Sequence, residues 1–334
     1  MRPTRGFAVL AIAAAAAAMI TTPADARTGA ASDDSVRYAW IKACPKPKKD
    51  YKIPCGNWTL AMRSGKTIKL TDARVNPKQA GGKVDKESSA LFAVSGDGRS
   101  VNYIKGDKLV VRDVNSGKVR PLPGRAAKLP KGIGQGEVDT TLSPDGSIAV
   151  VDYFDDAEKL PSLVANLKTG KVVELPSKNS VMSFSPDGQH LLTGRFTDDN
   201  ITEFAVFDAE GRETSSQVVP QIVSNNAPIA LADDGTTVTL IITGGSGKVR
   251  LRTYDLASDT VSDPVPLGTP KGESAQRLYW DAAGTLTLWT STGDEEGTVV
   301  SAVKRRVNAE TGATRKLDSF RVRSDPWTWW LPGE

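Results

Sequence analysis

Acidic side chains recur in short polar segments of this chain, and they are its most suggestive chemical groups. The carboxylates of interest lie in three such segments: Asp152, Asp155, Asp156, Asp198, Asp199, Asp294 and Glu295. Carboxylates that share one surface attract a cation or a basic segment of another protein. Acidic residues also keep loops soluble, so the pattern leaves both interpretations open.

Residues suited to acid-base or covalent chemistry are scarce. Such mechanisms need a base near the reacting group, most often a histidine, and the chain has one, His190, for which a structural role is the simpler interpretation. No G-x-S-x-G motif occurs, and "TGGSGK" at 243–248 departs from a phosphate-binding loop because Ile242 and Val249 stand where Gly and Ser or Thr are required. We therefore predict no catalytic residue and no cofactor, and leave a metal site open.

The N-terminus and the cysteines indicate export. Arg2 and Arg5 precede an apolar run at 7–20, and Ala-Asp-Ala at 24–26 fits a cleavage site, so residues 1–26 are expected to be a signal peptide. The protein would then be secreted, or held in a periplasm-like envelope space. Cys44 and Cys55 are the only cysteines, and an oxidising compartment favours a disulfide between them. Half of a zinc site is the alternative.

Composition narrows the range of partners. Hydrophobic residues make up 39% and charged residues 25% of the 334 residues, and 43 basic side chains are scattered among 39 acidic ones. Nucleic-acid binding needs clustered Lys and Arg, so no nucleic-acid partner is expected. The mature chain has no apolar stretch of about 20 residues, the length that a membrane helix needs. We expect a monomer that binds a protein or a cell-envelope component.

A repeated turn indicates how these residues are positioned. "SPDG" occurs twice, and related turns occur three more times, each ending in a glycine: Gly98, Gly146, Gly188, Gly235 and Gly284. The intervals are 48, 42, 47 and 49 residues. Alternating apolar segments follow each turn, and a second turn follows at Gly117, Gly170, Gly211 and Gly312. A period in the forties with four strands and two hairpins is typical of a propeller blade.

The fold prediction is an all-β propeller that occupies residues 27–334 as one domain. Five complete repeats span about 88–318, and a closing blade is expected to combine strands from 36–75 and 318–332. This gives six blades, while seven remain open if "SVRYAWIKA" and the linkers contain another. Trp327, Trp329 and Trp330 either pack within the closing blade or present aromatic rings to a ligand.

The pattern "FSPDGQHLLTG…FAVFDAEGRE" resembles the WD-repeat-like repeat of exported TolB-type propellers. The resemblance covers about 58–320 and implies the architecture. It implies no single activity, because such propellers bind proteins or accompany peptidases. The chain departs from true WD repeats in lacking their Gly-His start and Trp-Asp end.

In a propeller, the loops between the second and third strands share one face with the connections between blades. The acidic segments fall in those loops, as does Asp107, whereas Arg120, Arg125, Lys128 and Lys131 lie in a connection on the same face. We therefore expect a non-catalytic binding module that acts through its loop face. The alternative is an exported propeller enzyme of lactonase or glycan-cleaving type with a metal in its channel.

Overall fold

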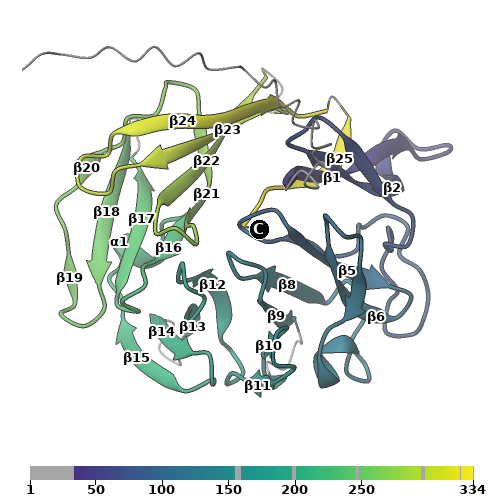
Figure 1. Ribbon diagram of the computed structural model, residues 1–334, viewed down its shortest axis with the longest axis horizontal. Helices are drawn as coiled ribbons and strands as arrows, with labels where there is room; N and C mark the ends of the chain where they lie inside the picture. Colours follow the sequence, from purple (N-terminus) through teal and green to yellow (C-terminus); the bar gives the residue numbers. More distant parts are fainter. Residues whose placement is uncertain are drawn as a thin grey trace, which may run out of the picture. The chain divides into compact units, whose positions relative to one another are not determined.

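Six antiparallel sheets are arranged in a ring, which makes the protein a six-bladed β-propeller (Figure 1). The computed structural model describes residues 34–154, 159–197, 201–244, 248–294, 298–323 and 325–333. Helix is confined, among these residues, to the 3-10 turn η1 (Gly124–Ala127) and the short α1 (Gln221–Ser224). We number the blades 1 to 5 in chain order and call the closing one blade 6.

Each complete blade runs from an inner to an outer strand. Blade 1 contains β4 (Phe92–Val94), β5 (Ser100–Lys105), β6 (Lys108–Asp113) and β7 (Val119–Pro121). Blade 2 contains β8 (Val138–Leu142), β9 (Ile148–Tyr153), β10 (Leu163–Asn166) and β11 (Val172–Glu174). Blade 3 contains β12 (Ser180–Phe184), β13 (His190–Phe196), β14 (Thr202–Asp208) and β15 (Glu213–Val218).

The last two complete blades differ at their outer edge. Blade 4 contains β16 (Ile229–Leu231), β17 (Thr237–Thr243) and β18 (Val249–Asp255), and its fourth position is split between β19 (Thr260–Val261) and β20 (Val265–Pro266). Blade 5 contains β21 (Ser274–Trp280), β22 (Leu286–Gly293), β23 (Val299–Val307) and β24 (Thr314–Arg321).

Blade 6 joins the two ends of the chain. Its order is β25 (Pro326–Trp330), β1 (Val36–Pro45), β2 (Lys52–Met62) and β3 (Thr67–Leu70), so one C-terminal strand completes three N-terminal ones. "SVRYAWIKA" is the second strand of this blade and adds no seventh blade. Residues 319–321, which were assigned by sequence to the closing blade, continue the outer strand of blade 5.

The repeated turn has a common hydrogen-bond pattern that explains its sequence. In "SPDG" of blade 2, the Ser143 hydroxyl donates to the Asp145 carboxylate at 2.9 Å, and that carboxylate accepts the Ser147 N–H at 2.9 Å. Gly146 has a φ of +67°, which favours glycine. Burial opposes ionisation of Asp145, but hydrogen bonds from Ser147, Lys168 and Ser143 outweigh it and lower its pKa to about 2.

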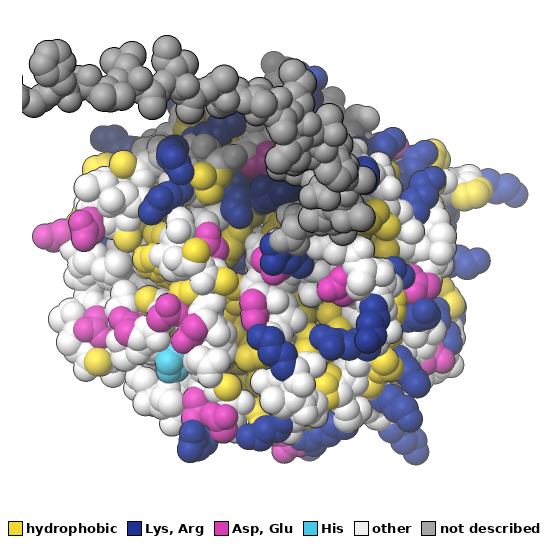
Figure 2. Space-filling view, viewed as in Figure 1, with side chains coloured by type: hydrophobic (Ala, Val, Ile, Leu, Met, Phe, Trp, Pro, Cys, Tyr) yellow, Lys and Arg dark blue, Asp and Glu magenta, His cyan; other side chains and the backbone are white. Residues whose placement is uncertain are grey.

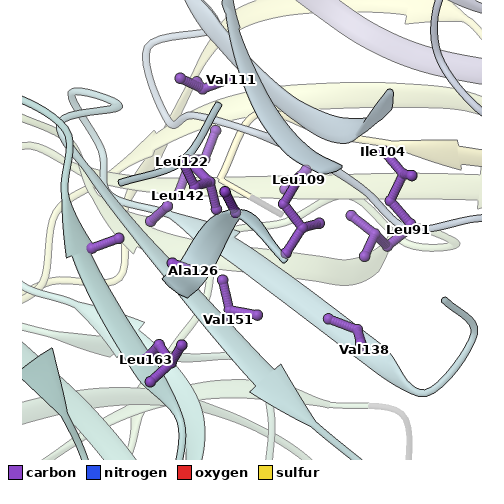
Figure 3. Packing of buried hydrophobic residues seen from close by; sticks show 14 of the residues in the cluster. Leu91, Ile104, Leu109, Val111, Leu122, Ala126, Val138, Leu142, Val151 and Leu163 are labelled. Atoms are coloured by element: carbon purple, nitrogen blue, oxygen red, sulfur yellow. The ribbon is translucent and has the colours of Figure 1, made fainter. Parts of the chain in front are cut away.

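The core lies between blades as well as within them. Figure 3 shows Leu91, Ile104 and Leu109 of the blade 1 region packed with Val138, Val151 and Leu163 of blade 2. Because neighbouring blades bury one another's apolar faces, each blade depends on the next. In blades 1 to 5, the hairpins between the first and second strands and between the third and fourth strands lie on one face, which we call the hairpin face; the β2–β3 hairpin of blade 6 lies there too. The loops between second and third strands, with the interblade connections, form the loop face.

Candidate functional site on the loop face

A pocket of about 490 Å³ opens where blades 2 and 3 meet on the loop face. We call it the aromatic pocket; its lining includes Tyr153, Phe154, Leu160, Met182, Phe196 and Phe204, together with Asp152, Asn179, Arg195 and Thr202. These residues come from β9 and the loop after it in blade 2, from the connection between the two blades, and from β12, β13 and β14 of blade 3. Apolar walls with a few polar groups are typical of a binding site.

Two phenylalanines stand exposed at this pocket. Phe154 is 60% and Phe196 is 70% exposed, and Ile201 at 44% follows Phe196 around the same loop. Each phenylalanine lies at the end of the second strand of its blade, so the strands of blades 2 and 3 present them on the same face. Exposed aromatic side chains beside a pocket indicate a surface that another molecule covers.

The floor of the pocket is held by a buried polar network around Asn179. Asn179 is 2% exposed; its side chain accepts a hydrogen bond from Thr193 at 2.8 Å and donates to the Pro176 carbonyl at 3.0 Å. The Ser162 hydroxyl donates to the Asn179 carbonyl at 3.3 Å and to Asp152 at 2.7 Å. Because these groups are satisfied by one another, the floor is rigid before any ligand arrives.

Arg195 in the pocket wall is fully engaged with carboxylates. Its guanidinium donates to both oxygens of Glu203 at 3.0 and 2.9 Å and to Glu213 at 3.2 Å. The hydrogen bonds and charge of Arg195 lower the pKa of Glu203 despite its partial burial. This bidentate geometry fixes the side chain in place. Arg195 therefore shapes the wall of the pocket.

Asp152 in the pocket lining is paired across blade 2 with a second carboxylate that does not line the pocket. Asp139 on β8 is directly opposite Asp152 on β9 in the strand register. Burial raises the pKa of Asp139, and the charge of Asp152 adds to this, although the Thr140 N–H donates to Asp139 at 2.8 Å and opposes it. Like charges facing each other across a ladder are destabilising. Asp152 of this pair lines the pocket together with the cations Lys178 and Arg195.

The structure separates the described members of the predicted acidic site. Asp152 lines the aromatic pocket, whereas Asp294 is in blade 5, where its carboxylate accepts the Thr298 N–H at 2.8 Å across its own hairpin. Asp155, Asp156, Asp198, Asp199 and Glu295 lie outside the described residues. Asp107 is not part of a continuous acidic rim, because Lys78 binds it at 2.8 Å.

The cysteines, the histidine, the glycine-rich segment and the C-terminal tryptophans that the sequence singled out lie away from the aromatic pocket. Cys44 and Cys55 form the predicted disulfide, which joins β1 to β2. His190 lies at the hairpin-face end of β13, close to Gly235 of blade 4 and far along the strand from Phe196. The segment 243–248 joins the paired strands β17 and β18. Trp329 and Trp330 pack into the apolar clusters on either side of blade 6, while Trp327 is 37% exposed.

No group of three or more His, Cys, Asp or Glu side chains among the described residues is placed to hold a metal ion. None of the helices in the described part is long and apolar enough to span a membrane.

The aromatic pair was the part of the site that sequence reasoning missed. Phe154 is followed at once by two aspartates, and Phe196 is followed by two aspartates after one residue. The sequence did contain a signal for this pair. Two successive repeats carry an aromatic side chain at the same position, where a strand ends.

Comparison with known proteins supports the fold alone. A solved complex of KlAtg21 with the coiled coil of AgAtg16 matches with 10% identity and a TM-score of 0.51, covering 86% of this chain and all (100%) of that one. TolB from Acinetobacter baumannii matches with 13% identity, 89% and 67% coverage and a TM-score of 0.47. A puromycin-hydrolyzing peptidase from Mycobacterium tuberculosis matches with 14% identity, 84% and 53% coverage and a TM-score of 0.42. No family model and no curated protein matches the sequence.

Proposed function

We propose that this chain is an exported, non-catalytic β-propeller that binds a protein partner through the aromatic pocket. The observation that supports the proposal is the pair Phe154 and Phe196, which are exposed at one pocket in sequence-equivalent positions of two neighbouring blades. Leaving two phenylalanines in water is costly unless a partner covers them. The disulfide and the N-terminal sequence support export.

The partner chemistry follows from the walls of the pocket. Its apolar lining suits a large apolar side chain, and its described charged residues are Asp152, Lys178 and Arg195, the last of which is paired with Glu203 and Glu213. The sequence adds Asp155, Asp156, Asp198 and Asp199 beside the two phenylalanines. The proposed ligand is therefore a segment that carries an apolar residue flanked by Lys or Arg.

In the proposed mechanism, the propeller holds the side chains of the pocket in place before the partner binds. Asn179, Ser162 and Thr193 hold the pocket floor, and the salt bridges of Arg195 hold its wall, so binding orders few further groups. Low ordering cost improves affinity at a given contact area. No chemical step is required of any residue in the pocket.

A labelled peptide with a central Leu flanked by lysines tests the proposal by fluorescence polarisation. Replacing both phenylalanines (Phe154→Ser with Phe196→Ser) is expected to weaken its binding about tenfold or more, because the apolar contact supplies the affinity. Reversing the aspartates at 152, 155, 156, 198 and 199 to Lys should abolish binding of this basic probe.

The matched control is Val300→Ser with Leu317→Ser. These residues of blade 5 are 40% and 43% exposed, so the variant replaces two exposed apolar side chains by serine at another blade. Equal binding by the wild type and the phenylalanine variant would contradict the proposal. A stoichiometric divalent ion in the purified protein, coupled to lactone or glycan hydrolysis, would instead support the enzyme alternative.

A further inference from the structure

A second hollow on the loop face is lined mainly by lysines and is therefore positively charged. This basic cleft has a volume of about 730 Å³ and lies over blade 1. Three chain segments converge on it: the connection into blade 1, the tight loop between β5 and β6, and the connection from blade 1 to blade 2. Its lining includes Lys78, Gln79, Lys105, Asp107, Lys108, Lys128, Leu129, Lys131, Ile133 and Gln135.

Hydrogen bonds of one buried glutamine hold the three segments of the cleft together. Gln135 is 5% exposed. Its side-chain oxygen accepts the Lys78 N–H at 2.9 Å, its own N–H donates to the Lys78 carbonyl at 2.6 Å, and its amide donates to the Gly106 carbonyl at 3.4 Å. A Cβ on Gly134 would lie 2.9 Å from the Ala80 nitrogen, so only glycine allows this close approach.

The charge of the cleft is only partly compensated. Five lysines line it, with Asp107 as the one carboxylate among the lining residues. Lys78 binds Asp107 at 2.8 Å and Lys105 binds Asp72 at 3.0 Å. Lys108, Lys128 and Lys131 make no ion pair with any residue that the structure describes. On the opposite, hairpin face, Lys and Arg also gather on the side of the ring near β2, β5 and β6 (Figure 2).

An apolar hollow adjoins the cleft and shares part of its wall. It has a volume of about 370 Å³ and is lined by Leu129, Pro130, Leu160, Pro161 and Leu163, among others. Lys128, Leu129 and Pro130 belong to both hollows. Unpaired positive charge therefore lies directly beside an apolar depression of side-chain size.

We propose that the basic cleft and this hollow together bind an acidic peptide segment of a partner protein. The carboxylates of the segment lie over Lys108, Lys128 and Lys131, and one aliphatic side chain enters the hollow beside Leu129. The hollow shares Tyr153 and Leu160 with the aromatic pocket, whereas the lysines that carry this proposal line the basic cleft and not that pocket.

The observations favour a peptide over other anions. The cations that line the cleft are lysines, which are point charges with no bidentate geometry for phosphate, and Arg125 of the hollow is paired with Glu174. Nucleic-acid and sugar sites rely on stacking, whereas the one aromatic ring among the lining residues of the cleft and the hollow is the buried Tyr153. A concave cleft cannot follow a flat bilayer. The adjoining apolar hollow requires an apolar side chain, which a polyphosphate lacks.

Fluorescence polarisation with a labelled peptide of about twelve residues, rich in Glu with one central Leu, tests this proposal. The variant Lys108→Glu, Lys128→Glu, Lys131→Glu is expected to weaken binding about tenfold or more, and added salt should weaken binding by the wild type. Leu129→Ala should reduce affinity for this peptide but leave affinity for a matched peptide with Ala in place of Leu unchanged.

A control with the same charge change is Lys66→Glu, Lys118→Glu, Lys171→Glu. These exposed lysines lie in or beside the hairpins of blades 6, 1 and 2 on the opposite face, and this variant should bind the peptide like the wild type. Equal loss in both variants would overturn the proposal. So would tighter binding of inorganic polyphosphate or phosphatidylglycerol vesicles than of the peptide, or a dimer in sedimentation that only the cleft variant abolishes.

Discussion

At the scale of single residues, Glu273 and Arg305 make the most buried ion pair among the described residues. Their side chains are 8% and 10% exposed, and the Arg305 Nε donates to Glu273 at 2.9 Å. Burial opposes ionisation of Glu273. Hydrogen bonds from Arg305 and Thr290 and the charge of Arg305 outweigh burial and lower the pKa of Glu273. The pair lies where the chain enters the inner strand of blade 5.

Glu273→Ala is expected to reduce the free energy of unfolding by about 3 kcal/mol, because it leaves a buried guanidinium without its counter-charge. Urea denaturation measures this. As a control, Lys168→Ala removes a pair with Asp145 whose side chains are 71% and 38% exposed, and it should change stability by less than about 1 kcal/mol. Similar losses of stability in Glu273→Ala and Lys168→Ala would contradict the conclusion that burial makes the Glu273–Arg305 pair more important.

The difference in the free energy of unfolding between the wild type and Glu273→Ala should depend on pH in a direction that the pKa of Glu273 determines. Since the folded protein holds the pKa of Glu273 below its ordinary value of 4.5, the stabilisation is complete above that value. It is lost as pH falls through the lower, folded pKa. The gap in stability between the wild type and Glu273→Ala should therefore narrow in acid, and a constant gap down to pH 2 would contradict the assignment.

At the scale of elements, the hairpin between the third and fourth strands of a blade shows how the same turn meets different neighbours in different blades. In blades 2 and 5, an asparagine starts the turn, and its carbonyl accepts the N–H of the glycine four residues later at 2.9 Å. These glycines, Gly170 and Gly312, have φ values of +78° and +68°. A Cβ on Gly170 would meet nothing within 4 Å, whereas one on Gly312 would lie 2.1 Å from the Pro266 carbonyl oxygen of blade 4.

Gly170→Ala and Gly312→Ala are therefore expected to differ although the turns match. The first should cost about 1 kcal/mol, the price of a positive φ with a side chain. The second should cost about 2 kcal/mol more, because the added methyl group also displaces the backbone of the neighbouring blade. Thermal and urea unfolding measure both. Equal costs would show that contact between blades 4 and 5 does not constrain this hairpin.

At the scale of the whole molecule, ring closure depends on the C-terminal strand. Trp330, Trp329 and Thr328 of β25 pair with Ala39, Trp40 and Ile41 of β1. Leu331 is fully buried, and the Gly333 N–H donates to the Val94 carbonyl of blade 1 at 3.0 Å. The last residues therefore contact blade 1 as well as completing blade 6, and they cover an edge that would otherwise be open.

Removing residues 325–334 is expected to abolish cooperative unfolding or to cause aggregation, because it exposes the edge of β1 and opens the aromatic cluster beside blade 5. Circular dichroism melting and light scattering measure this outcome. A synthetic peptide of residues 325–334 should restore folding, and the same peptide with Ala at 329 and 330 should not. A truncated protein that melts like the full chain would contradict closure by this strand.

Much of the fold could be predicted from sequence because its determinants are local and repeated. The turns at Gly146 and Gly188 are formed by Ser, Asp and Gly within six residues, and strand alternation follows from the same short window. Repetition at a fixed interval then implies a ring of blades. The pairing of Cys44 with Cys55 was equally accessible, because the two residues are close in sequence and no other cysteine competes.

The residues that form the aromatic pocket and the basic cleft come together only in the tertiary structure. The aromatic pocket joins Tyr153 of blade 2 to Met182 of blade 3, and the basic cleft joins Lys78, Lys108 and Lys131 from three separate segments. Asp107 illustrates the difference: in sequence it extends an acidic pattern, while in the folded chain Lys78 neutralises it. Local sequence determines whether a residue is in a strand or a turn, but side chains distant in the chain meet only through the packing of one blade on the next.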